Sequence, residues 1–430
     1  MKVRAHILSL SVARGIAALC AAVVVASQAR AQADIVTFSA LAIDPTAPNT
    51  LYAGTLGASV SIVGASVLKS LDSGESWEAV NMGLGSSQVF ALAIDPGTPS
   101  TLYAGTDSGV FKSTDSGGSW EAVNTGLGAS DVFALAIDPA TLSTLYAGTD
   151  SGVFKSTDGG DTWSETLPAQ AVTALAIDRS TPRTLYAGTG ECSAGPGSCI
   201  GSVFKSTDAA TNWHAVNTGL PSNTVFTVLA IDPASSSTLY AGTGVGVFKS
   251  TDGASSWEVV DTILPIPGRN YVSALAIDPT PPSTLYAGLS AGVFKSTDGA
   301  SNWLDANSGL TGGPTILAMD PTTPSTLYAV TPFGTGFFKS TDGATTWHAV
   351  NTDLPAACRG DCNADGGVAV DELVTLVSIA LGTAQPSACL RGFPIAGHVD
   401  ITLIVQAVRS ALGLTECTNP CGGTENGGCR

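Results

Sequence analysis

Seven segments of this chain follow one plan, and this repetition limits the possible folds more than any other feature. Each segment contains a variant of "ALAIDP", a short turn, "TLYAG", a loop, "VFKS" and an octet such as "STDGGDTW" (156–163). All seven tryptophans end an octet, seven of the eight tyrosines lie in the "LY" pair, and every lysine after residue 31 lies in the "KS" pair. The octets begin at Ser70, Ser113, Ser156, Ser206, Ser250, Ser296 and Ser340. A period of about 45 residues repeated seven times indicates a ring or an array of similar units.

Each segment has four short runs of β-branched, aromatic and aliphatic residues, separated by Gly, Pro, Asp and Ser. Such runs predict strands and turns, and no helical period occurs before residue 366. Four strands in about 45 residues are typical of a β-propeller blade. The sequence therefore predicts an all-β seven-bladed propeller of four-stranded blades over residues 36–355. A parallel β-solenoid is the alternative, but its coils are usually shorter and need no hairpin that carries a tryptophan.

The octet has three interpretations: a metal loop, a catalytic turn or a structural turn. The third is favoured because the Asp carboxylate can accept N–H groups of its own turn, Gly tolerates positive φ, and Trp can pack between blades. The octet resembles the Asp-box, or BNR repeat, S-x-D-x-G-x-T-W, of sialidases, xyloglucan-cleaving enzymes, sortilin-type receptors and photosystem assembly factors. In those families the box is the hairpin between the third and fourth strands, remote from the active site.

The match to this pattern is incomplete, since the fourth octet, "STDAATNW", has no Gly and the last three have Gly one place earlier. The resemblance implies a structural role for the box residues, with ion binding as the alternative. These residues are Asp72, Asp115, Asp158, Asp208, Asp252, Asp298 and Asp342, with Trp77, Trp120, Trp163, Trp213, Trp257, Trp303 and Trp347.

The loops of the predicted blades fall into a uniform and a variable set. The turns between first and second strands ("DPGTPST", "DPATLST") and the octets barely change, whereas the other loops include "GECSAGPGSCIGS" and "DTILPIPGRNY". The two sets lie on opposite faces of a propeller, so one variable face carries the individuality of the protein. On it, Asp107, Asp150 and Glu191 are weak candidates for catalytic carboxylates, and Arg269 and Tyr271 for ligand contacts. Copied turns for Asp107 and Asp150, and a solvated loop for Arg269 and Tyr271, are the favoured explanations.

A sialidase mechanism is disfavoured. Retaining sialidases need three arginines from different blades, but the predicted propeller has only three, and Arg179 and Arg183 share one turn on the uniform face. A glycosidase with two carboxylates roughly 5–10 Å apart remains open, although the xyloglucan-cleaving relatives build their cleft from two propellers. No nucleophile–base set and no zinc constellation is recognisable, so the sequence leans towards a protein that is not an enzyme.

Residues 1–31 predict a secretory signal, with a basic start, the apolar run "GIAALCAAVVVA" and the small-residue site "ARA". We expect an exported protein, extracellular, at the cell surface or in the periplasm, without a transmembrane segment after cleavage. Cleavage leaves 14 basic and 35 acidic residues, a net charge of about −21, which argues against nucleic acid or an anionic membrane as partner. Eight cysteines remain, and the spacing of Cys192 and Cys199 suits a local disulfide.

After Pro355 the composition changes, and a short helical module is predicted over 356–417. Its stretch "DCNADGGVAVDE" matches the EF-hand calcium loop D-x-[DN]-x-[DN]-G-x5-E. The ligands to one Ca²⁺ would be Asp361, Asn363, Asp365, the Gly367 carbonyl and Glu372. A second loop–helix unit, "GFPIAGHVDITLIVQAVRSALG", has lost the acidic ligands. Two tandem units resemble a type I dockerin, which implies a cohesin-like partner; a disulfide-pinned domain stabilised by its ion is the alternative. The tail 418–430 is rich in Gly and Cys.

These patterns together predict an exported, non-catalytic propeller that binds or attaches to extracellular glycan or protein and carries a calcium-binding, dockerin-like module. The alternative is a glycoside hydrolase or lyase that acts on polysaccharide from the variable face. A third class is a structural surface component that assembles with calcium and takes no small ligand.

Overall fold

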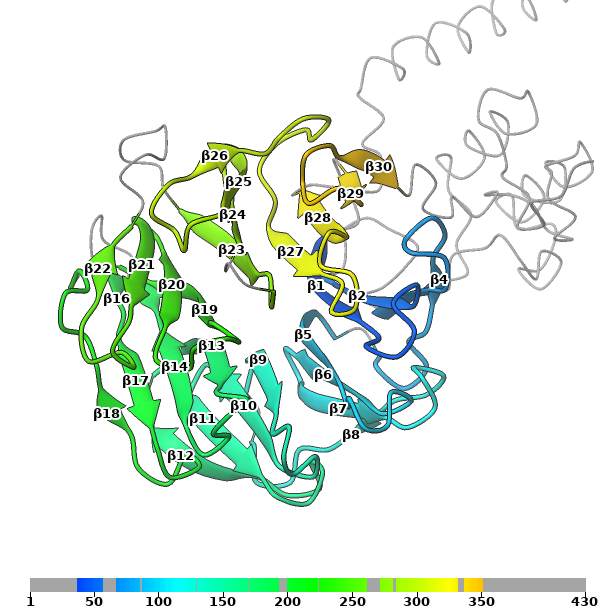
Figure 1. Ribbon diagram of the computed structural model, residues 1–430. Coiled ribbons are helices and arrows are strands. Elements are labelled where there is room, and N and C mark those ends of the chain that lie inside the picture. Colours follow the sequence, from blue (N-terminus) through cyan, green and yellow to red (C-terminus); the bar gives the residue numbers. More distant parts are fainter. Residues whose placement is uncertain are drawn as a thin grey trace, which may run out of the picture. The chain divides into compact units, whose positions relative to one another are not determined.

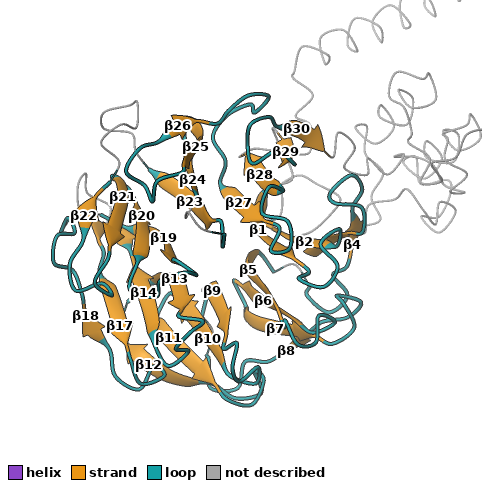
Figure 2. Cartoon of the chain, viewed as in Figure 1, coloured by secondary structure: helices purple, strands orange, loops and turns teal. Residues whose placement is uncertain are grey.

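Seven four-stranded antiparallel sheets are arranged around a common centre (Figures 1 and 2). The computed structural model describes residues 37–350 except 57–66, 86, 129, 169, 193–198, 223, 261–270, 281–283 and 332–335. This part consists of strands, turns and loops, and it contains no helix that could cross a membrane. Each sheet is one blade, formed from one sequence segment in the order first, second, third and fourth strand.

The four strands of each blade occupy the same positions in every repeat. The innermost strands are β1 (Phe38–Ile43), β5 (Val89–Ile94), β9 (Val132–Ile137), β13 (Val172–Ile177), β19 (Phe226–Ile231), β23 (Val272–Ile277) and β27 (Ile316–Met319). The second strands are β2 (Leu51–Thr55), β6 (Leu102–Thr106), β10 (Leu145–Thr149), β14 (Leu185–Thr189), β20 (Leu239–Thr243), β24 (Leu285–Leu289) and β28 (Leu327–Thr331).

The third strands end where the octets begin. They are β3 (Val67–Ser70), β7 (Gly109–Ser113), β11 (Gly152–Ser156), β17 (Val203–Ser206), β21 (Gly246–Ser250), β25 (Gly292–Ser296) and β29 (Gly336–Ser340). The outermost strands are β4 (Glu78–Ala79), β8 (Glu121–Ala122), β12 (Ser164–Pro168), β18 (His214–Ala215), β22 (Glu258–Val259), β26 (Leu304–Asp305) and β30 (His348–Val350). Blade four also carries a small hairpin of β15 (Glu191–Cys192) and β16 (Cys199–Ile200).

Neighbouring innermost strands contact one another around the whole ring, from β1 through β5, β9, β13, β19 and β23 to β27 and back to β1. The prediction of a seven-bladed propeller with four-stranded blades is therefore confirmed. The solenoid alternative is wrong, because all strand pairs within a blade are antiparallel.

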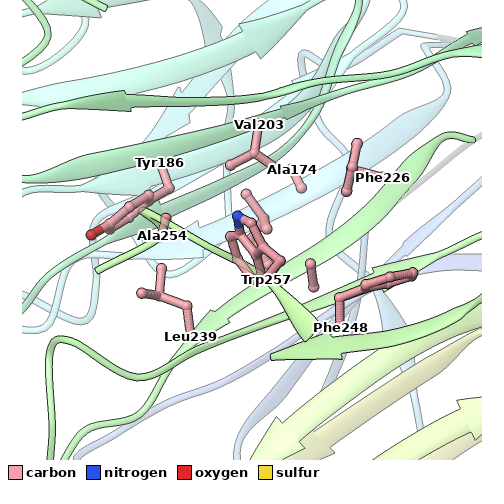
Figure 3. Packing of buried hydrophobic residues seen from close by; sticks show 10 residues of the cluster. Ala174, Tyr186, Val203, Phe226, Leu239, Phe248, Ala254 and Trp257 are labelled. Atoms are coloured by element: carbon pink, nitrogen blue, oxygen red, sulfur yellow. The ribbon is translucent and has the colours of Figure 1, made fainter. Parts of the chain in front are cut away.

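The core lies between blades and follows from the second-strand sequence "LYAGT", which is buried along its whole length. Successive side chains of a strand point to opposite faces, so its tyrosine packs towards the next blade and its leucine and alanine towards the previous one. Figure 3 shows this between blades four and five, where Tyr186 and Val203 meet Leu239, Phe248 and Trp257. Each such layer between two blades is called a seam below.

Each of blades one to six also sends a lysine across the seam to the next blade. Lys112 lies with its Nζ 5.7 Å from the centroid of the Tyr103 ring and donates to the Gly159 carbonyl at 2.9 Å. The Tyr103 hydroxyl donates to the same carbonyl at 3.1 Å. Equivalent lysine bonds of 2.7–3.3 Å start from Lys69, Lys155, Lys205, Lys249 and Lys295. The repeated "LY" and "KS" pairs are thus parts of one inter-blade contact.

The octet of blade three is the hairpin turn between β11 and β12. The Asp158 carboxylate accepts the backbone N–H of Thr162 at 2.9 Å and the hydroxyls of Thr162 and Ser156 at 2.6 and 2.7 Å. The Ser156 hydroxyl in turn accepts the N–H of Gly160 at 2.9 Å. The Trp163 indole donates to the Val123 carbonyl of the previous blade at 2.8 Å. The polar groups of the octet are therefore used within the turn and at the seam.

Acid pH should weaken the fold through these carboxylates. Hydrogen bonds from the side chain and backbone of Thr162 hold the pKa of Asp158 at about 2, and the pKa values of Asp115, Asp252 and Asp342 are also about 2. The folded pKa lies below the unfolded value of about 4, so the stabilisation is complete above pH 4 and is lost as the pH falls towards 2. We expect the urea midpoint to fall across this window, and an unchanged midpoint down to pH 2 would contradict this role.

Two consecutive residues of each octet adopt positive φ, which explains why Gly can occupy either place. Gly159 and Gly160 have φ of 75° and 96°, and Gly253 and Ala254 have 69° and 71°. Blade four uses Ala209 and Ala210 at 61° and 66°. Blade four therefore keeps the same backbone conformation without glycine. Alanine adopts this left-handed conformation at a cost of about 1–2 kcal/mol per residue.

Ala209→Gly should therefore stabilise the protein by about 0.5–1 kcal/mol, because glycine relieves the left-handed strain but loses more entropy on folding. Chemical denaturation would measure the change. The matched control is Ala187→Gly within β14, which should destabilise, since no strain is relieved in a buried strand. Equal effects of the two substitutions would show that strain at Ala209 is unimportant.

Candidate functional site

On the face opposite the octets, backbone hydrogen bonds join the loop after each second strand to the start of the innermost strand. In five blades, the residue that follows the second strand donates its backbone N–H to a carbonyl of the same blade. The acceptor is the residue directly before the innermost strand. These pairs are Leu56–Thr37, Asp107–Gln88, Asp150–Asp131, Gly190–Ala171 and Gly244–Val225. The loops that carry these pairs form the variable face. Side chains at these positions differ from blade to blade, unlike those of the octets.

Blades two and three bring three carboxylates together on this face. Asp107 Oδ1 accepts the N–H of Gln88 and the hydroxyl of Ser108, at 3.1 and 3.2 Å. Partial burial raises the pKa of the Asp131 carboxyl, and the neighbouring charges of Asp150 and Asp107 raise it further. Sequence reasoning selected Asp107 and Asp150 but missed Asp131. The sequence distinguishes Asp131 only by one position, the residue before "VFALAID", which is Gln88 in blade two and Asp131 in blade three.

Two phenyl rings of the same two blades contact each other. Phe90 and Phe133 are the second residues of β5 and β9, and their ring centroids are 5.4 Å apart with planes tilted by 52°. Both rings are half-buried. A β-bulge interrupts the β9–β10 register at this point, between Val132 and Ala134. Sequence reasoning also missed this pair, although only two of the seven segments read "VFALAI".

The remaining candidates are spread over other blades. Glu191 lies in β15 of blade four, and Tyr271, which is 49% exposed, directly precedes β23 of blade six. Arg269 lies outside the described residues, as do Asp361, Asn363, Asp365, Gly367 and Glu372 of the predicted calcium loop. The structure therefore places Asp107 and Asp150 around Asp131 in blades two and three, whereas Glu191 and Tyr271 belong to blades four and six.

Cys192 and Cys199 are direct cross-strand partners in the β15–β16 register. Directly opposed residues of antiparallel strands have Cα atoms about 4.5–5.5 Å apart, which is within the range of disulfides. We expect a disulfide here in the protein purified without reductant. Mass spectrometry of a tryptic digest should find the two cysteines in one peptide that alkylates only after reduction. Alkylation of both thiols before reduction would contradict this pairing.

Positive charge is kept away from the variable face in the part of the chain that the structure describes. Its seven lysines are the next-to-last residues of the third strands, at the octet end, and its two arginines, Arg179 and Arg183, flank the turn between β13 and β14. Exposed apolar side chains occur on the variable face at Ile200, Val245 and Tyr271, and elsewhere at Leu71, Met82, Val259 and Leu304. The described residues contain no group of three or more His, Cys, Asp or Glu side chains able to hold a metal ion.

The chain matches no protein-family model and none of the curated proteins. Among solved structures, it resembles the Niastella koreensis GH74 enzyme (22% identity, TM-score 0.51) over 73% of this chain and 59% of that one. It resembles the Xanthomonas campestris GH74 xyloglucanase (18% identity, TM-score 0.52) over 75% of this chain and 62% of that one. It also resembles YCF48 from Cyanidioschyzon merolae (12% identity, TM-score 0.52), over 72% of this chain and 96% of that one.

The common feature is the propeller. At these identities the likeness concerns the fold alone, and that fold is used both by glycoside hydrolases and by a protein whose structure was solved bound to D1 peptide, YCF48. The chain spans about three fifths of the length of the two GH74 enzymes.

Proposed function

We propose that this chain is an exported, non-catalytic propeller that binds or attaches to an extracellular glycan or protein through its variable face. The observation that carries the proposal is the contrast between the two faces. The octet carboxylates and the lysines are engaged in turns and seams, whereas the variable face presents side chains that differ between blades. Binding propellers of this architecture include YCF48, solved with D1 peptide.

The C-terminal module would contribute one calcium site, formed by Asp361, Asn363, Asp365, Gly367 and Glu372. Calcium binding should stabilise this module, because a ligand that binds only the folded state raises its stability. Calorimetric titration of the metal-free protein with CaCl₂ should give one site, and Asp365→Ala should abolish it. Whether the loaded module takes a cohesin-like partner is tested by retention on an immobilised type I cohesin with calcium and with EDTA.

A hydrolase is the second candidate, favoured by one specific observation. The raised pKa of Asp131 beside Asp150 and Asp107 is a feature of paired carboxylates that work as general acid and base. GH74 enzymes have the same fold. Against this, the described carboxylates all come from one propeller.

One screen separates the two candidates. The mature protein with calcium is tested against soluble polysaccharides, cell-wall glycans and immobilised extracellular proteins. Retention of the protein on each ligand and release of reducing sugar are both recorded. Retention without release is expected. Release of sugar that disappears in Asp131→Asn or Asp150→Asn, but persists in Glu121→Gln on the outermost strand β8, would overturn the non-catalytic proposal and support the hydrolase.

A further inference from the structure

The seam between blades three and four departs from the repeated pattern at its tryptophan. In five other blades, the octet indole donates to a backbone carbonyl of the previous blade at 2.7–2.9 Å. The Trp213 indole instead lies 3.4 Å from the Thr166 hydroxyl, which is longer than the usual hydrogen bond. Trp213 is also only partly buried, whereas the other six tryptophans are 2–5% exposed. The indole that joins two blades elsewhere is therefore weakly bound here.

The tyrosine of the same seam lacks an acceptor. In five other blades, the tyrosine hydroxyl donates to a carbonyl in the octet of the next blade at 3.1–3.4 Å. The Tyr146 hydroxyl is buried, and within the described residues it is the one buried side-chain polar atom without a hydrogen-bond partner. Lys155 still donates to the Ala209 carbonyl at 2.8 Å, so the seam is closed. A buried hydroxyl without a partner raises the free energy of this closed seam relative to a state in which water reaches the hydroxyl.

The backbone contact between neighbouring blades also differs here. In blades one, two, four and six, a glycine with a φ of 86–96° follows the outermost strand, and an added Cβ would lie 2.0–2.2 Å from the carbonyl oxygen of the next octet tryptophan. These glycines are Gly83, Gly126, Gly219 and Gly309. Blade three has no glycine between Trp163 and Val172, and its outermost strand β12 continues for five residues, compared with two in β8. Blade three therefore cannot make this close contact with blade four.

The buried side chains of this seam form two separate clusters. One consists of Val153, Leu167, Val172 and Ala187, and the other of Tyr146, Leu185 and Ala210. Trp213 packs against both clusters but is fully buried in neither. In the next seam, by contrast, Trp257 belongs to a single buried cluster (Figure 3). Because Trp213 stays partly exposed, its indole contributes less to the hydrophobic stabilisation of the closed seam.

We propose that the ring of blades opens locally and reversibly at the seam between blades three and four. The seam between the last and first blades is held more firmly, since the rings of Phe38, Trp77, Tyr328 and Phe337 lie there with centroid distances of 5.2–5.9 Å. Opening between blades three and four leaves every sheet intact, because each sheet belongs to one blade. The open state gives water access to the Tyr146 hydroxyl and exposes the facing surfaces of the two blades. This step is independent of the proposed binding function.

Buried alanines at one repeated position provide matched probes of opening. Ala187, Ala147 and Ala53 are each 0% exposed and lie in the seams of blades three and four, two and three, and seven and one. Each is replaced by cysteine in the mature full-length chain with calcium. Alkylation in native buffer is followed by mass spectrometry of the peptide that carries the new thiol. Since a buried thiol reacts only when its seam opens, we expect about tenfold faster alkylation of Ala187→Cys than of the other two variants.

Two tyrosine substitutions test the cause of opening. Tyr146→Phe removes the hydroxyl that has no partner, so it should stabilise the closed seam and slow alkylation of the Ala187→Cys protein about tenfold. Tyr103→Phe removes a hydroxyl that donates to the Gly159 carbonyl at 3.1 Å, and should speed alkylation of the Ala147→Cys protein about fivefold. Urea denaturation gives a second measure that needs no cysteine. The midpoint should rise for Tyr146→Phe and fall for Tyr103→Phe.

Equal alkylation rates at the three positions would overturn the proposal, as would the fastest rate in Ala53→Cys, which would place the opening between the last and first blades. An unchanged or lower urea midpoint of Tyr146→Phe would also overturn it, because the closed seam would then carry no cost from the buried hydroxyl. If Ala187→Cys does not fold, the urea midpoints of the two tyrosine variants decide.

Discussion

Replacing Phe337 with alanine is expected to lower the free energy of unfolding by about 3–5 kcal/mol and to loosen the seam between blades seven and one. Phe337 is 2% exposed and stands where the third strands of the other six blades have valine. Its ring lies edge-on to Trp77 with a centroid distance of 5.2 Å, and 5.9 and 5.8 Å from the rings of Phe38 and Tyr328. This aromatic group joins the last blade to the first.

The location of the effect distinguishes ring closure from ordinary core packing. Phe111→Ala in blade two removes the same side chain from another seam, where it is 8% exposed, and serves as the control. Hydrogen exchange should accelerate in β1–β4 and β27–β30 of the Phe337→Ala protein, and in blade two and its neighbour for the control. Uniform acceleration throughout both proteins would contradict a special role for Phe337 in closing the ring.

Gly83→Ala is the second substitution with a large expected effect, a loss of about 2–5 kcal/mol. Gly83 has a φ of 96°, and an added Cβ would lie 2.1 Å from the Trp120 carbonyl oxygen of the next blade. Its neighbour Met82 accepts the Trp120 N–H at 2.8 Å, so the two backbones cannot separate without loss of this bond. Urea denaturation of the variant measures the effect.

The same loop provides the matched control. Gly85 also has positive φ, 67°, but an added Cβ would meet no atom within 4 Å. Gly85→Ala should therefore show only the left-handed strain, about 1–2 kcal/mol. If both substitutions lowered the free energy of unfolding equally, the blades would be able to move apart, and the close contact at Gly83 would not exclude a Cβ atom.

The fold was predictable because its information is local and repeated seven times. Four strand signals per segment, the turn residues and the period of about 45 residues give the blade count without any long-range contact. The partners of Lys112 and Tyr103 were not predictable in the same way. Their common acceptor, the Gly159 carbonyl, lies in the next blade, and only the ring geometry brings it into reach.

The variable face was predictable as a surface but only partly as a site. The equivalence of Asp107 and Asp150 is visible in the repeat, whereas Asp131 differs from its counterpart Gln88 at one loop position that carries no strand or turn signal. Phe90 and Phe133 carry no distinguishing signal in the sequence, since an aromatic residue in a β pattern suits a buried core equally well. Only the structure shows that their rings contact each other where other blades have Ser or Thr.

In the described residues each blade is a contiguous stretch of chain, and no strand of blade one or seven is exchanged for a strand of the other. The unit of structure is therefore also a unit of inheritance. A tandem duplication of one segment adds a complete blade, with its own lysine for the following octet, and leaves every existing strand pair intact. The nearly identical sequences of blades two and three fit such recent copying, while the aromatic group around Phe337 distinguishes the two ends at which the series stops. Growth by whole blades leaves the variable face free to diverge one loop at a time.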